Sequence, residues 1–300
     1  MENVLVTGYT GFLGKSIFDS LSGCYRVYGL SRNSGDYILS LESIVPDFID
    51  NFDLIIHCAG KAHNVPRTEL EKEAFYKVNY DGTLNLLKGL EKSGLPKQFV
   101  FISSVAVYGK EEGRNIDEEC ALLAKDSYGL SKIKAEELIT KWCEEKNIIC
   151  TILRLPLLVG KKPPGNLGAM LNAIKKGYYF NIGGGKAKKS MVLVRDVASF
   201  IPIVTPVGGI YNLTDGLHPS FYELSSVIAE NKNKKRPFDL PLNIAKLIGC
   251  FGDFLGEKAP VNSLKIKKIT SDLTFDDSKA RELLGWNPQS VLEYLKNNSL

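Results

Sequence analysis

The sequence predicts an α/β fold in which a doubly wound parallel sheet is followed by a smaller C-terminal α/β lobe. Short apolar runs rich in β-forming residues alternate with helical segments through the first half of the chain, as in parallel sheets covered on both faces. Near Gly160 the composition changes, because "GKKPPGNLGAM" is rich in Pro and Gly and the later apolar runs are short. We therefore expect one domain over residues 1–158, to which 191–214 return, and a second lobe made of 159–190 and 215–300.

A glycine-rich loop follows the first apolar run. In "VLVTGYTGFLG", residues 4–14, Gly8, Gly11 and Gly14 recur every three residues. The first glycine permits a tight turn, the second lets the backbone approach an anion, and the third lets a helix pack on the strand. A helix that begins near Phe12 would present free N–H groups and its positive dipole end to the loop. The loop predicts a pyrophosphate site, although an ordinary strand-to-helix turn has the same composition.

The remaining elements of the sheet are predicted by periodicity. Two long segments have helical patterning, "EAFYKVNYDGTLNLLKGLEKSG" (73–94) and "SYGLSKIKAEELITKWCEEKN" (127–147). Six apolar runs read as strands: "NVLVTG", "YRVYGLS", "DLIIHCAG", "QFVFISS", "ICTILRLPLLVG" and "GIYNLTD". In the second lobe, "LPLNIAKLIGCFGDFLG" predicts a helix that packs on the lobe; a cap over a substrate or a helix lying on a membrane surface are the alternatives.

Composition excludes several classes of protein. The 300 residues are 44% hydrophobic and 24% charged, without an apolar run of about 18 residues, so we expect a cytoplasmic protein with no membrane span. Six scattered cysteines show no CxxC spacing, which predicts reduced thiols and no metal site. The net charge of +4 is mild and the lysines are spread over short clusters, so nucleic acid is not an expected partner.

The strongest chemical signal lies in "DSYGLSKIKAEE". Tyr128 and Lys132 are four residues apart, which places both on one face of a helix with Cβ atoms about 5–6 Å apart. An ammonium beside a phenol favours the phenolate, so we expect Lys132 to lower the pKa of Tyr128 from about 10. Tyr128 would then serve as an acid or base near neutral pH, although the same spacing also arises by chance on amphipathic helices.

Two serines end the strand predicted over "FVFISS". Ser103 and Ser104 would lie at the carboxyl edge of the sheet, where open α/β sheets bind ligands. A serine hydroxyl at this edge can donate to a developing alkoxide or carbonyl oxygen and so complement Tyr128. Serines at strand ends are also common turn formers, so the neighbouring motifs decide between the two interpretations.

Together these segments resemble the extended short-chain dehydrogenase/reductases that act on nucleotide sugars, over nearly the whole chain. Each motif alone is weakly specific, but the occurrence of all of them in this order is strongly specific. The matching segments are "TGYTGFLG", "IIHCAGKAH", "KVNYDGTLNLL", "FISSVAVYG", "YGLSK", "LRLPLLVG" and "DDSKARELLGWNP". The resemblance implies a Rossmann dinucleotide-binding domain over 1–158, a nucleotide-sugar-binding lobe beyond it, and a homodimer formed by the helices that carry Asn79 and Tyr128.

The resemblance also implies roles for single residues. Tyr128 would be the acid/base, Lys132 would bind the nicotinamide ribose, and Ser104, counted back from "VYG", would take the catalytic hydroxyl position. The implied cofactor site comprises Gly8, Thr10, Gly11, Phe12, Leu13, Gly14, Arg32, Ala59, Gly60, Asn79 and Lys132. The implied substrate site comprises Ser104, Tyr128, His63, Asn166 and Lys189, of which His63 also fits an exposed loop and Asn166 an ordinary turn.

Departures from the family pattern favour one reaction. Val105 and Ala106 stand where the similar 4,6-dehydratases carry an Asp-Glu pair, and neither can transfer a proton. The segments "HCAGKAH", "GNLGAM" and "SDLTFDDSKARELLGW" look most similar to bacterial 4-ketoreductases that complete UDP-N-acetylquinovosamine-type sugars for surface polysaccharides. We therefore expect a UDP-4-keto-6-deoxy-N-acetylhexosamine 4-reductase, with a UDP-hexose or UDP-N-acetylhexosamine 4-epimerase as the alternative and a non-catalytic NAD(P)-binding sensor as the second.

The end of the second strand bears on the choice of cofactor. An acidic residue there would bind the adenosine ribose and repel a 2′-phosphate, but the chain has Ser31 and Arg32. Arg32 would clamp a phosphate, so NADP(H) is the expected cofactor. NAD(H) stays possible because Asp36 lies nearby and Arg32 would also fit an exposed or adenine-stacking position.

Overall fold

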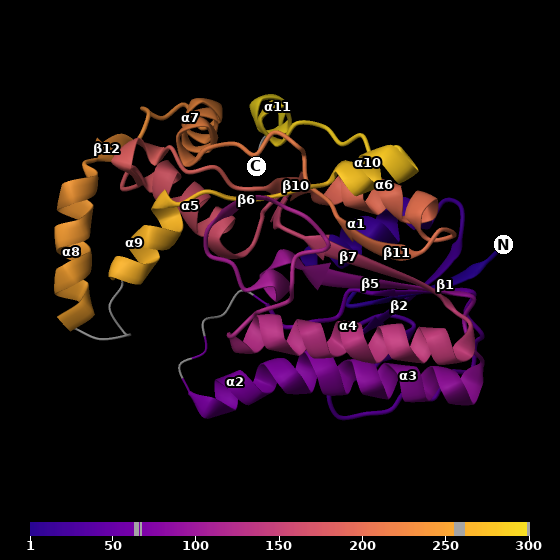
Figure 1. The fold of residues 1–300 in the computed structure, drawn as a ribbon. Helices are drawn as coiled ribbons and strands as arrows, with labels where there is room; N and C mark the ends of the chain where they lie inside the picture. Colours follow the sequence, from indigo (N-terminus) through magenta and orange to yellow (C-terminus); the bar gives the residue numbers. More distant parts are fainter. Residues whose placement is uncertain (63–65, 67, 255–261, 299–300) are drawn as a thin grey trace.

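The computed structural model describes residues 1–62, 66, 68–254 and 262–298. Within these residues, one sheet of seven strands pairs in parallel throughout, which confirms the predicted fold class (Figure 1). In sheet order the strands are β3 (Tyr37–Ile38), β2 (Arg26–Ser31), β1 (Asn3–Thr7), β4 (Leu54–His57), β5 (Gln98–Ser104), β7 (Ile149–Leu155) and β11 (Gly209–Asn212).

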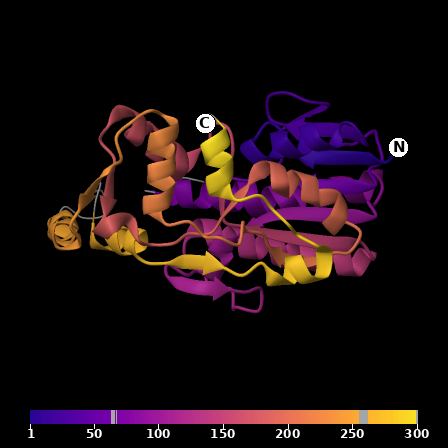
Figure 2. The same ribbon diagram turned by 90° about the horizontal axis from the view of Figure 1, so that it is seen from above.

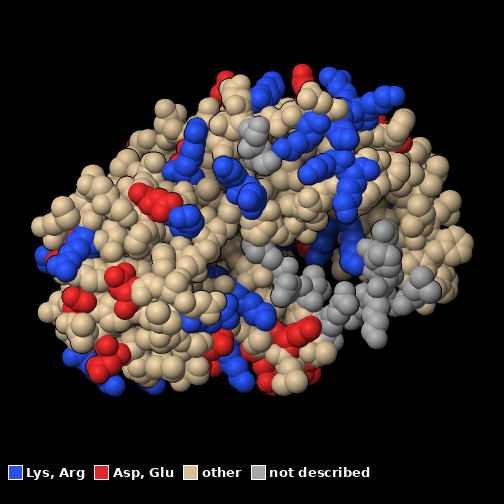
Figure 3. Space-filling model, turned by 180° about the vertical axis from the view of Figure 1, so that it is seen from behind, with Lys and Arg blue, Asp and Glu red and all other residues tan. Residues whose placement is uncertain are grey.

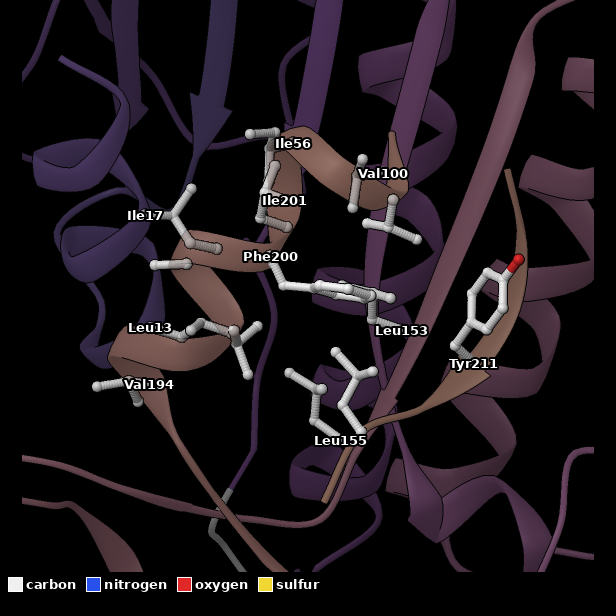
Figure 4. Close-up of a cluster of buried hydrophobic side chains, with 14 of the residues drawn as sticks. Leu13, Ile17, Ile56, Val100, Leu153, Leu155, Val194, Phe200, Ile201 and Tyr211 are labelled. Atoms are coloured by element: carbon white, nitrogen blue, oxygen red, sulfur yellow. The ribbon is translucent and has the colours of Figure 1, made fainter. Parts of the chain in front are cut away.

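Helices cover both faces of the sheet because its strands are apolar on both sides. One face packs against α1 (Phe12–Leu21) and α6 (Val194–Val204), which lie above the sheet in Figure 1, and their buried side chains interlock with those of the strands in Figure 4. The opposite face packs against α3 (Gly82–Ser93) and α4 (Ser127–Lys146). The sheet is therefore buried on both faces, and the loops that connect strands to helices lie at its two ends.

The strand order reverses at β1, which pairs with β2 on one side and with β4 on the other. In an open α/β sheet such a reversal opens a crevice beyond the carboxyl ends of the two strands, and ligands bind there. Helix α1 begins at this crevice, directly after the glycine-rich loop. The topology thus places the predicted pyrophosphate loop where a dinucleotide would be bound.

The helical segment predicted over 73–94 is interrupted. It consists of α2 (Glu69–Tyr76), a π-helical turn (Lys77–Asp81) and α3. Hydrophobic periodicity does not distinguish one wider turn from regular helix, so the sequence predicted a single element. The π turn matters because it contains Asn79.

The second lobe consists of short elements beside the carboxyl edge of the sheet (Figure 2). A buried cluster there joins α5 (Gly165–Lys176), α7 (Phe221–Asn231) and α11 (Val291–Asn297). Outside the main sheet, the described residues form three two-stranded sheets, which pair β8 (Leu157–Val159) with β10 (Met191–Leu193), β9 (Phe180–Ile182) with β12 (Phe238–Leu240), and β6 (Gly113–Ile116) with β13 (Leu273–Phe275), so that two of them join strands of the predicted first domain, or of the segment that returns to it, to one another or to the C-terminal part. Helix α10 (Ser278–Leu284) also packs near the main sheet.

Two further helices extend from this lobe. Helices α8 (Leu242–Phe254) and α9 (Ser263–Thr270) contact each other, and α8 stands at the edge of the molecule in Figure 1. In the described part of the chain, no helix is long and apolar enough to cross a membrane.

Candidate functional site

The glycine-rich loop makes close backbone contacts at the end of β1. Gly8 has φ +64°, its N–H donates to the carbonyl of Leu30 at 2.8 Å, and a Cβ on it would lie 2.8 Å from the backbone of Ala59. A Cβ on Gly14 would lie 2.3 Å from the Gly8 carbonyl oxygen, and the N–H of Gly11 donates to that oxygen at 2.9 Å. These contacts require glycine at positions 8 and 14, in agreement with the turn and packing roles predicted from the spacing.

Helix α1 opens onto this loop with an uncapped end. Its N-cap is Gly11, which has no side chain to accept from the first-turn N–H groups, and the first turn carries no acidic residue. Thr10 is exposed, Phe12 is partly buried and Leu13 is buried in the core, so Leu13 would face a ligand only through its backbone. The helix end therefore offers N–H donors and a positive dipole to an anion.

Tyr128 is positioned by the start of α4. Asp126 caps this helix by accepting from the N–H of Tyr128 at 3.1 Å and of Gly129 at 3.0 Å. The phenol ring packs against Phe75 of α2, with ring centroids 6.0 Å apart. The cap and the ring contact together fix the direction in which the hydroxyl points.

The two serines at the end of β5 point to opposite sides, as successive residues of a strand do. The Ser104 side chain lies close enough to the phenol of Tyr128 to lower its pKa, and its oxygen accepts from the N–H of Ala106 at 3.2 Å. Ser103 is buried and donates to the carboxylate of Glu136. The structure thus brings Ser104, and not Ser103, to Tyr128.

Lys132 lies one turn beyond Tyr128 and is buried. Its ammonium donates to the carbonyl of Ile102 at 2.8 Å and lies 4.4 Å from the centre of the Phe101 ring. Burial lowers the pKa of Lys132 to about 8, while the charge of Glu136 acts in the opposite direction. Lys132 is therefore held against β5 by a backbone acceptor.

The predicted effect of Lys132 on Tyr128 is wrong in this structure. Burial raises the pKa of Tyr128 above its ordinary value of 10.0, the neighbouring Ser104 side chain lowers it, and the charge of Asp126 raises it further. The reason is geometric, because the ammonium of Lys132 is directed to the Ile102 carbonyl. Tyr128 is accordingly a protonated phenol at neutral pH, suited to donate a proton.

Asn79 is buried in the π turn and organises the segment after β4. Its side-chain oxygen accepts from the N–H of Lys61 at 2.7 Å, and its amide donates to the Ser131 hydroxyl at 2.8 Å. Gly60 lies against the same groups, because a Cβ there would be 3.2 Å from the Asn79 oxygen and 3.3 Å from the Lys132 nitrogen. Asn79, Gly60 and Lys132 therefore meet at one point of the crevice.

A buried chain of hydrogen bonds runs behind this point. Thr83 donates to the Asn79 carbonyl at 2.6 Å, so it accepts from Nε2 of His57 at 2.9 Å. Thr7 accepts from the N–H of Ala59 at 3.2 Å and donates to Nδ1 of His57 at 2.6 Å. Each donor in this series of hydrogen bonds has one acceptor, so His57 must be the neutral tautomer that carries its proton on Nε2. Burial agrees, since it lowers the pKa of His57 to about 3.

The end of β2 presents a basic group and engages its acidic neighbour. Arg32 is exposed, and the hydroxyl of Ser31 donates to the carbonyl of Ser34 at 2.7 Å, which closes the loop behind it. Asp36 accepts from the N–H of Gly29 at 2.8 Å. Asp36, the acidic residue that would favour NAD(H), is thus bound to the backbone of β2, whereas the side chain of Arg32 is exposed.

The predicted substrate residues of the second lobe are more dispersed. Asn166 is exposed in the first turn of α5, and Lys189 donates through its ammonium to the carbonyl of Lys268 at 2.9 Å. Within the described residues, no hydrogen bond joins either side chain to Tyr128 or Ser104. His63 lies outside the described residues.

An ion pair that the motifs did not reveal supports the site. Glu136 and Arg154 are both buried, with 2.8 Å between the nearest atoms, and Arg154 also donates to the Tyr108 hydroxyl at 3.2 Å. Glu136 lies on α4 two turns after Tyr128. The signal was present in the sequence, because Tyr128, Lys132 and Glu136 recur at four-residue spacing on one helical face.

These residues fit a dinucleotide. The uncapped α1 terminus and the close-packed glycines suit a pyrophosphate, Lys132 and Asn79 lie at the carboxyl edge where the reacting end of the ligand would be, and Arg32 extends at the other end. The two ends are joined by the crevice between β1 and β4. The predicted loop, serine, tyrosine and lysine therefore meet at a single edge of the sheet.

Comparison with known proteins agrees with this geometry. Residues 4–213 match the NAD dependent epimerase/dehydratase family. An N-acetyl-alpha-D-glucosaminyl-diphospho-ditrans,octacis-undecaprenol 4-epimerase of Escherichia coli O157:H7 is 29% identical over 93% of this chain and 88% of its own. A GDP-6-deoxy-D-mannose reductase of Pseudomonas aeruginosa is 27% identical over 76% and 80%.

A solved structure shows the same fold. The UDP-glucose 4-epimerase of Thermotoga maritima superimposes with a TM-score of 0.74 at 23% identity, over 98% of this chain and 96% of that one. The family match spans more than two thirds of the chain and includes the glycine loop, Ser104, Tyr128 and Lys132. The chain belongs to the NAD-dependent epimerase/dehydratase family.

Proposed function

We propose that this enzyme moves a hydride at C4 of an N-acetylhexosamine carried on a diphosphate, and that 4-epimerisation is the overall reaction. The observation that carries the proposal is the position of Ser104 beside the phenol of Tyr128, with buried Lys132 one turn away, at the carboxyl edge of the sheet. Two hydroxyl groups converge there on one point, where a sugar hydroxyl would exchange its proton. Membership of the family supports a nicotinamide dinucleotide as the cofactor.

In the proposed mechanism the protein handles the proton and the orientation of the substrate. A bound nicotinamide supplies the hydride acceptor and donor at C4. Reduction of the ketone takes the proton of the Tyr128 phenol, oxidation of the C4 hydroxyl returns that proton to the Tyr128 phenolate, and Ser104 donates to the C4 oxygen. Lys132, held by the Ile102 carbonyl, is the residue that we assign to the nicotinamide ribose, and Asn79 holds the backbone of Lys61 beside it.

The residues after Ser104 argue against a dehydratase. Val105 and Ala106 follow it in a short 3-10 helix, and Val107 and Tyr108 are buried. Elimination of water across C5 and C6 needs an acid and a base at the neighbouring carbons, and neither Val105 nor Ala106 has a titratable group. Chemistry confined to C4 is consistent with this arrangement.

The choice between epimerase and reductase depends on the relatives. The 4-epimerase of E. coli aligns over nearly the full chain, which is why we propose epimerisation first. The 4-keto-6-deoxy-N-acetylhexosamine reduction predicted from the sequence is the second candidate, and the similarity to the P. aeruginosa reductase supports it. The two reactions share one site and differ in whether the ketone is re-reduced before release or enters from outside.

The carrier of the sugar follows the same reasoning. We propose a diphosphate bound to N-acetylglucosamine, attached either to uridine, as the sequence predicted, or to a polyprenyl chain, as in the name of the E. coli relative. Lys189 and Asn166 are the residues of the second lobe that we assign to the diphosphate and nucleotide side. This assignment rests on the matching sequence motifs.

Product analysis tests the proposal. Purified enzyme is incubated in turn with UDP-N-acetylglucosamine, with undecaprenyl-diphospho-N-acetylglucosamine, and with a UDP-4-keto-6-deoxy-N-acetylhexosamine made in place by a dehydratase. Formation of the galacto epimer without net change of nicotinamide absorbance supports the epimerase. Stoichiometric oxidation of NADPH or NADH by the ketosugar identifies the reductase, and no product from any of the three would exclude C4 chemistry.

Three finer points are proposed on the same basis. NADP(H) is the preferred cofactor because Arg32 is exposed at the end of β2 while Asp36 is bound to the Gly29 N–H. A homodimer would form through α3 and α4, whose outer faces are polar, and light scattering of the pure protein measures it. The cytoplasm is the compartment we predict, where free dinucleotide and sugar diphosphates are available.

A further inference from the structure

Helix α8 packs on its neighbour through its smallest residues. The buried residues of α8 are Ala245, Gly249 and Gly252. A Cβ on Gly249 would lie 2.6 Å from the Ile266 side chain of α9. The two helices are also joined end to end, because the Ser263 hydroxyl donates to Asp253 at 2.6 Å. Helix α8 therefore packs against the protein through small residues, and none of its large side chains is buried in this contact.

The large apolar side chains of α8 lie on another face. Leu247 is 62% exposed, Phe251 72% and Phe254 89%, in contrast to the usual burial of Leu and Phe. They recur at the three- and four-residue spacing of one helical face with Ile244 and Ile248, which are also exposed. Figures 1 and 2 place α8 at the margin of the molecule farthest from the parallel sheet, and the exposed fractions show that these side chains are not covered by the rest of the protein.

Positive charge is concentrated in the same lobe. Residues 159–190 contain seven lysines and no Asp or Glu, and residues 231–270 contain nine Lys or Arg and three Asp or Glu, although the whole chain has a net charge of only +4. Seen from behind, where α8 forms the right-hand margin, Lys and Arg gather beside an uncharged edge (Figure 3). Exposed Lys234, Lys235 and Arg236 lead into β12, whose Phe238 is 76% exposed next to the start of α8.

Part of this charge is already neutralised within the protein. Lys267 and Lys268 of α9 pair with Glu112 and Glu111 at 3.2 and 2.9 Å. The exposed basic groups nearest in sequence to the apolar face are Lys246 on α8 and the cluster Lys234–Arg236 before β12, while Asp253, the acidic residue of α8, is engaged by the Ser263 hydroxyl. The arrangement is an apolar helical face with a cationic border, which is typical of helices that lie in the headgroup region of a bilayer.

We propose that α8 docks this lobe on the surface of an anionic lipid bilayer, with Leu247, Phe251 and Phe254 inserted among the headgroups and the basic border against acidic lipids. A second copy of the chain fits the face less well, because pairing two α8 faces would bring two strongly positive lobes together. The proposal concerns a surface away from Tyr128 and does not depend on which C4 reaction the enzyme performs.

Vesicle flotation of the full-length chain tests the proposal. We expect the protein to float with vesicles of phosphatidylcholine and phosphatidylglycerol, to float at least about tenfold less with phosphatidylcholine alone, and to be released by raised salt. Leu247→Glu/Phe251→Glu should lose binding by at least about tenfold. The matched control Ile49→Glu/Ile203→Glu changes two exposed apolar residues of the sheet domain and should bind as the wild type does.

A second variant keeps the test independent of folding defects. Phe251→Trp retains an apolar face, and its indole emission should shift to the blue with acidic vesicles, whereas Trp142 and Trp286 are buried already. Absence of wild-type flotation, or equal flotation of Leu247→Glu/Phe251→Glu, would overturn the proposal. So would a dimer in light scattering that this double variant converts to monomer without any vesicle binding, because a second copy would then cover the face.

Discussion

The carboxylate of Glu136 and the guanidinium of Arg154 form a buried ion pair beneath the catalytic face of α4, 2.8 Å apart and less than 6% exposed on either side chain. Glu136 also accepts from Ser103, and Arg154 from β7 donates to the Tyr108 hydroxyl. The pair thus joins the helix that carries Tyr128 to the two strands below it. Its position explains how a surface-facing helix holds the buried Lys132 and the half-buried Tyr128 in register.

Breaking this pair on one side should destabilise the whole domain. Arg154→Met leaves the Glu136 carboxylate buried without its partner, which costs about 3–5 kcal/mol of unfolding free energy. Chemical denaturation measures the loss. The exposed pair of Lys141 and Glu145, on the same helix, is the control, and Lys141→Met should change stability by less than about 1 kcal/mol. Equal effects of the two variants would contradict the structural role of Glu136 and Arg154.

Tyr128→Phe should abolish turnover and leave dinucleotide binding nearly unchanged. The substitution removes the hydroxyl beside Ser104 but keeps the ring against Phe75. Single-turnover assays and dinucleotide titration give the two readouts. Tyr178→Phe, at an exposed tyrosine of the second lobe, serves as the control and should retain activity. Full activity in Tyr128→Phe would exclude the proposed acid/base.

Gly60→Ala should weaken dinucleotide binding. The added methyl would press on the Asn79 side-chain oxygen and the Lys132 nitrogen, at 3.2 and 3.3 Å, and so displace both groups from the crevice. We expect a rise in the dissociation constant of about tenfold, equivalent to about 1.4 kcal/mol. Gly23→Ala meets no atom within 4 Å and should bind as the wild type does. Isothermal titration of both variants decides the matter.

Arg32→Ser should reduce the preference for NADPH over NADH. A guanidinium at the end of β2 would contact the 2′-phosphate of NADPH. Its loss should raise the Michaelis constant for NADPH and leave the Michaelis constant for NADH unchanged. Arg26→Ser, at the opposite end of the same strand, provides the comparison. If the ratio of the two constants is the same in both variants, Arg32 does not select the cofactor.

His57 should make folding sensitive to acid. The unfolded chain protonates this residue near pH 6.5 but the folded protein only near pH 3, so the unfolded state binds the additional proton between those values. The free energy of unfolding therefore falls as the pH drops through this window, by up to about 5 kcal/mol. In His57→Gln this part of the slope should vanish. Thermal melts across the window that run parallel for both proteins would refute the assignment.

The sequence predicted the sheet and its carboxyl edge because those features depend on short-range patterns. The glycine spacing anticipated the backbone contacts at Gly8 and Gly14, and the strand-end rule placed Ser104 beside Tyr128. Alternation along β5 then separated Ser104 from Ser103, as the family motif had indicated. Each of these features is decided within a few residues of the chain.

Other features depend on distant residues and were not predicted. The pKa of Tyr128 follows from burial and from the direction of Lys132, whose ammonium goes to the Ile102 carbonyl, and spacing on a helix gives neither. Arg154, the partner of Glu136, is 18 residues away on β7, whereas Glu136 lies on α4. The outward face of α8 was one alternative among three, because periodicity gives an apolar stripe without saying which side meets the protein.

The π turn at Lys77–Asp81 means that the positions of Phe75 and Asn79 depend on the number of residues in this segment. Deleting one residue there would restore regular helix and rotate α2 by about 100° relative to α3. Phe75 would then leave the ring of Tyr128, and the Asn79 position would turn away from Lys61. A segment that reads as one uniform helix is in effect a spacer of fixed length, so this part of the enzyme should accept substitutions far more readily than insertions or deletions.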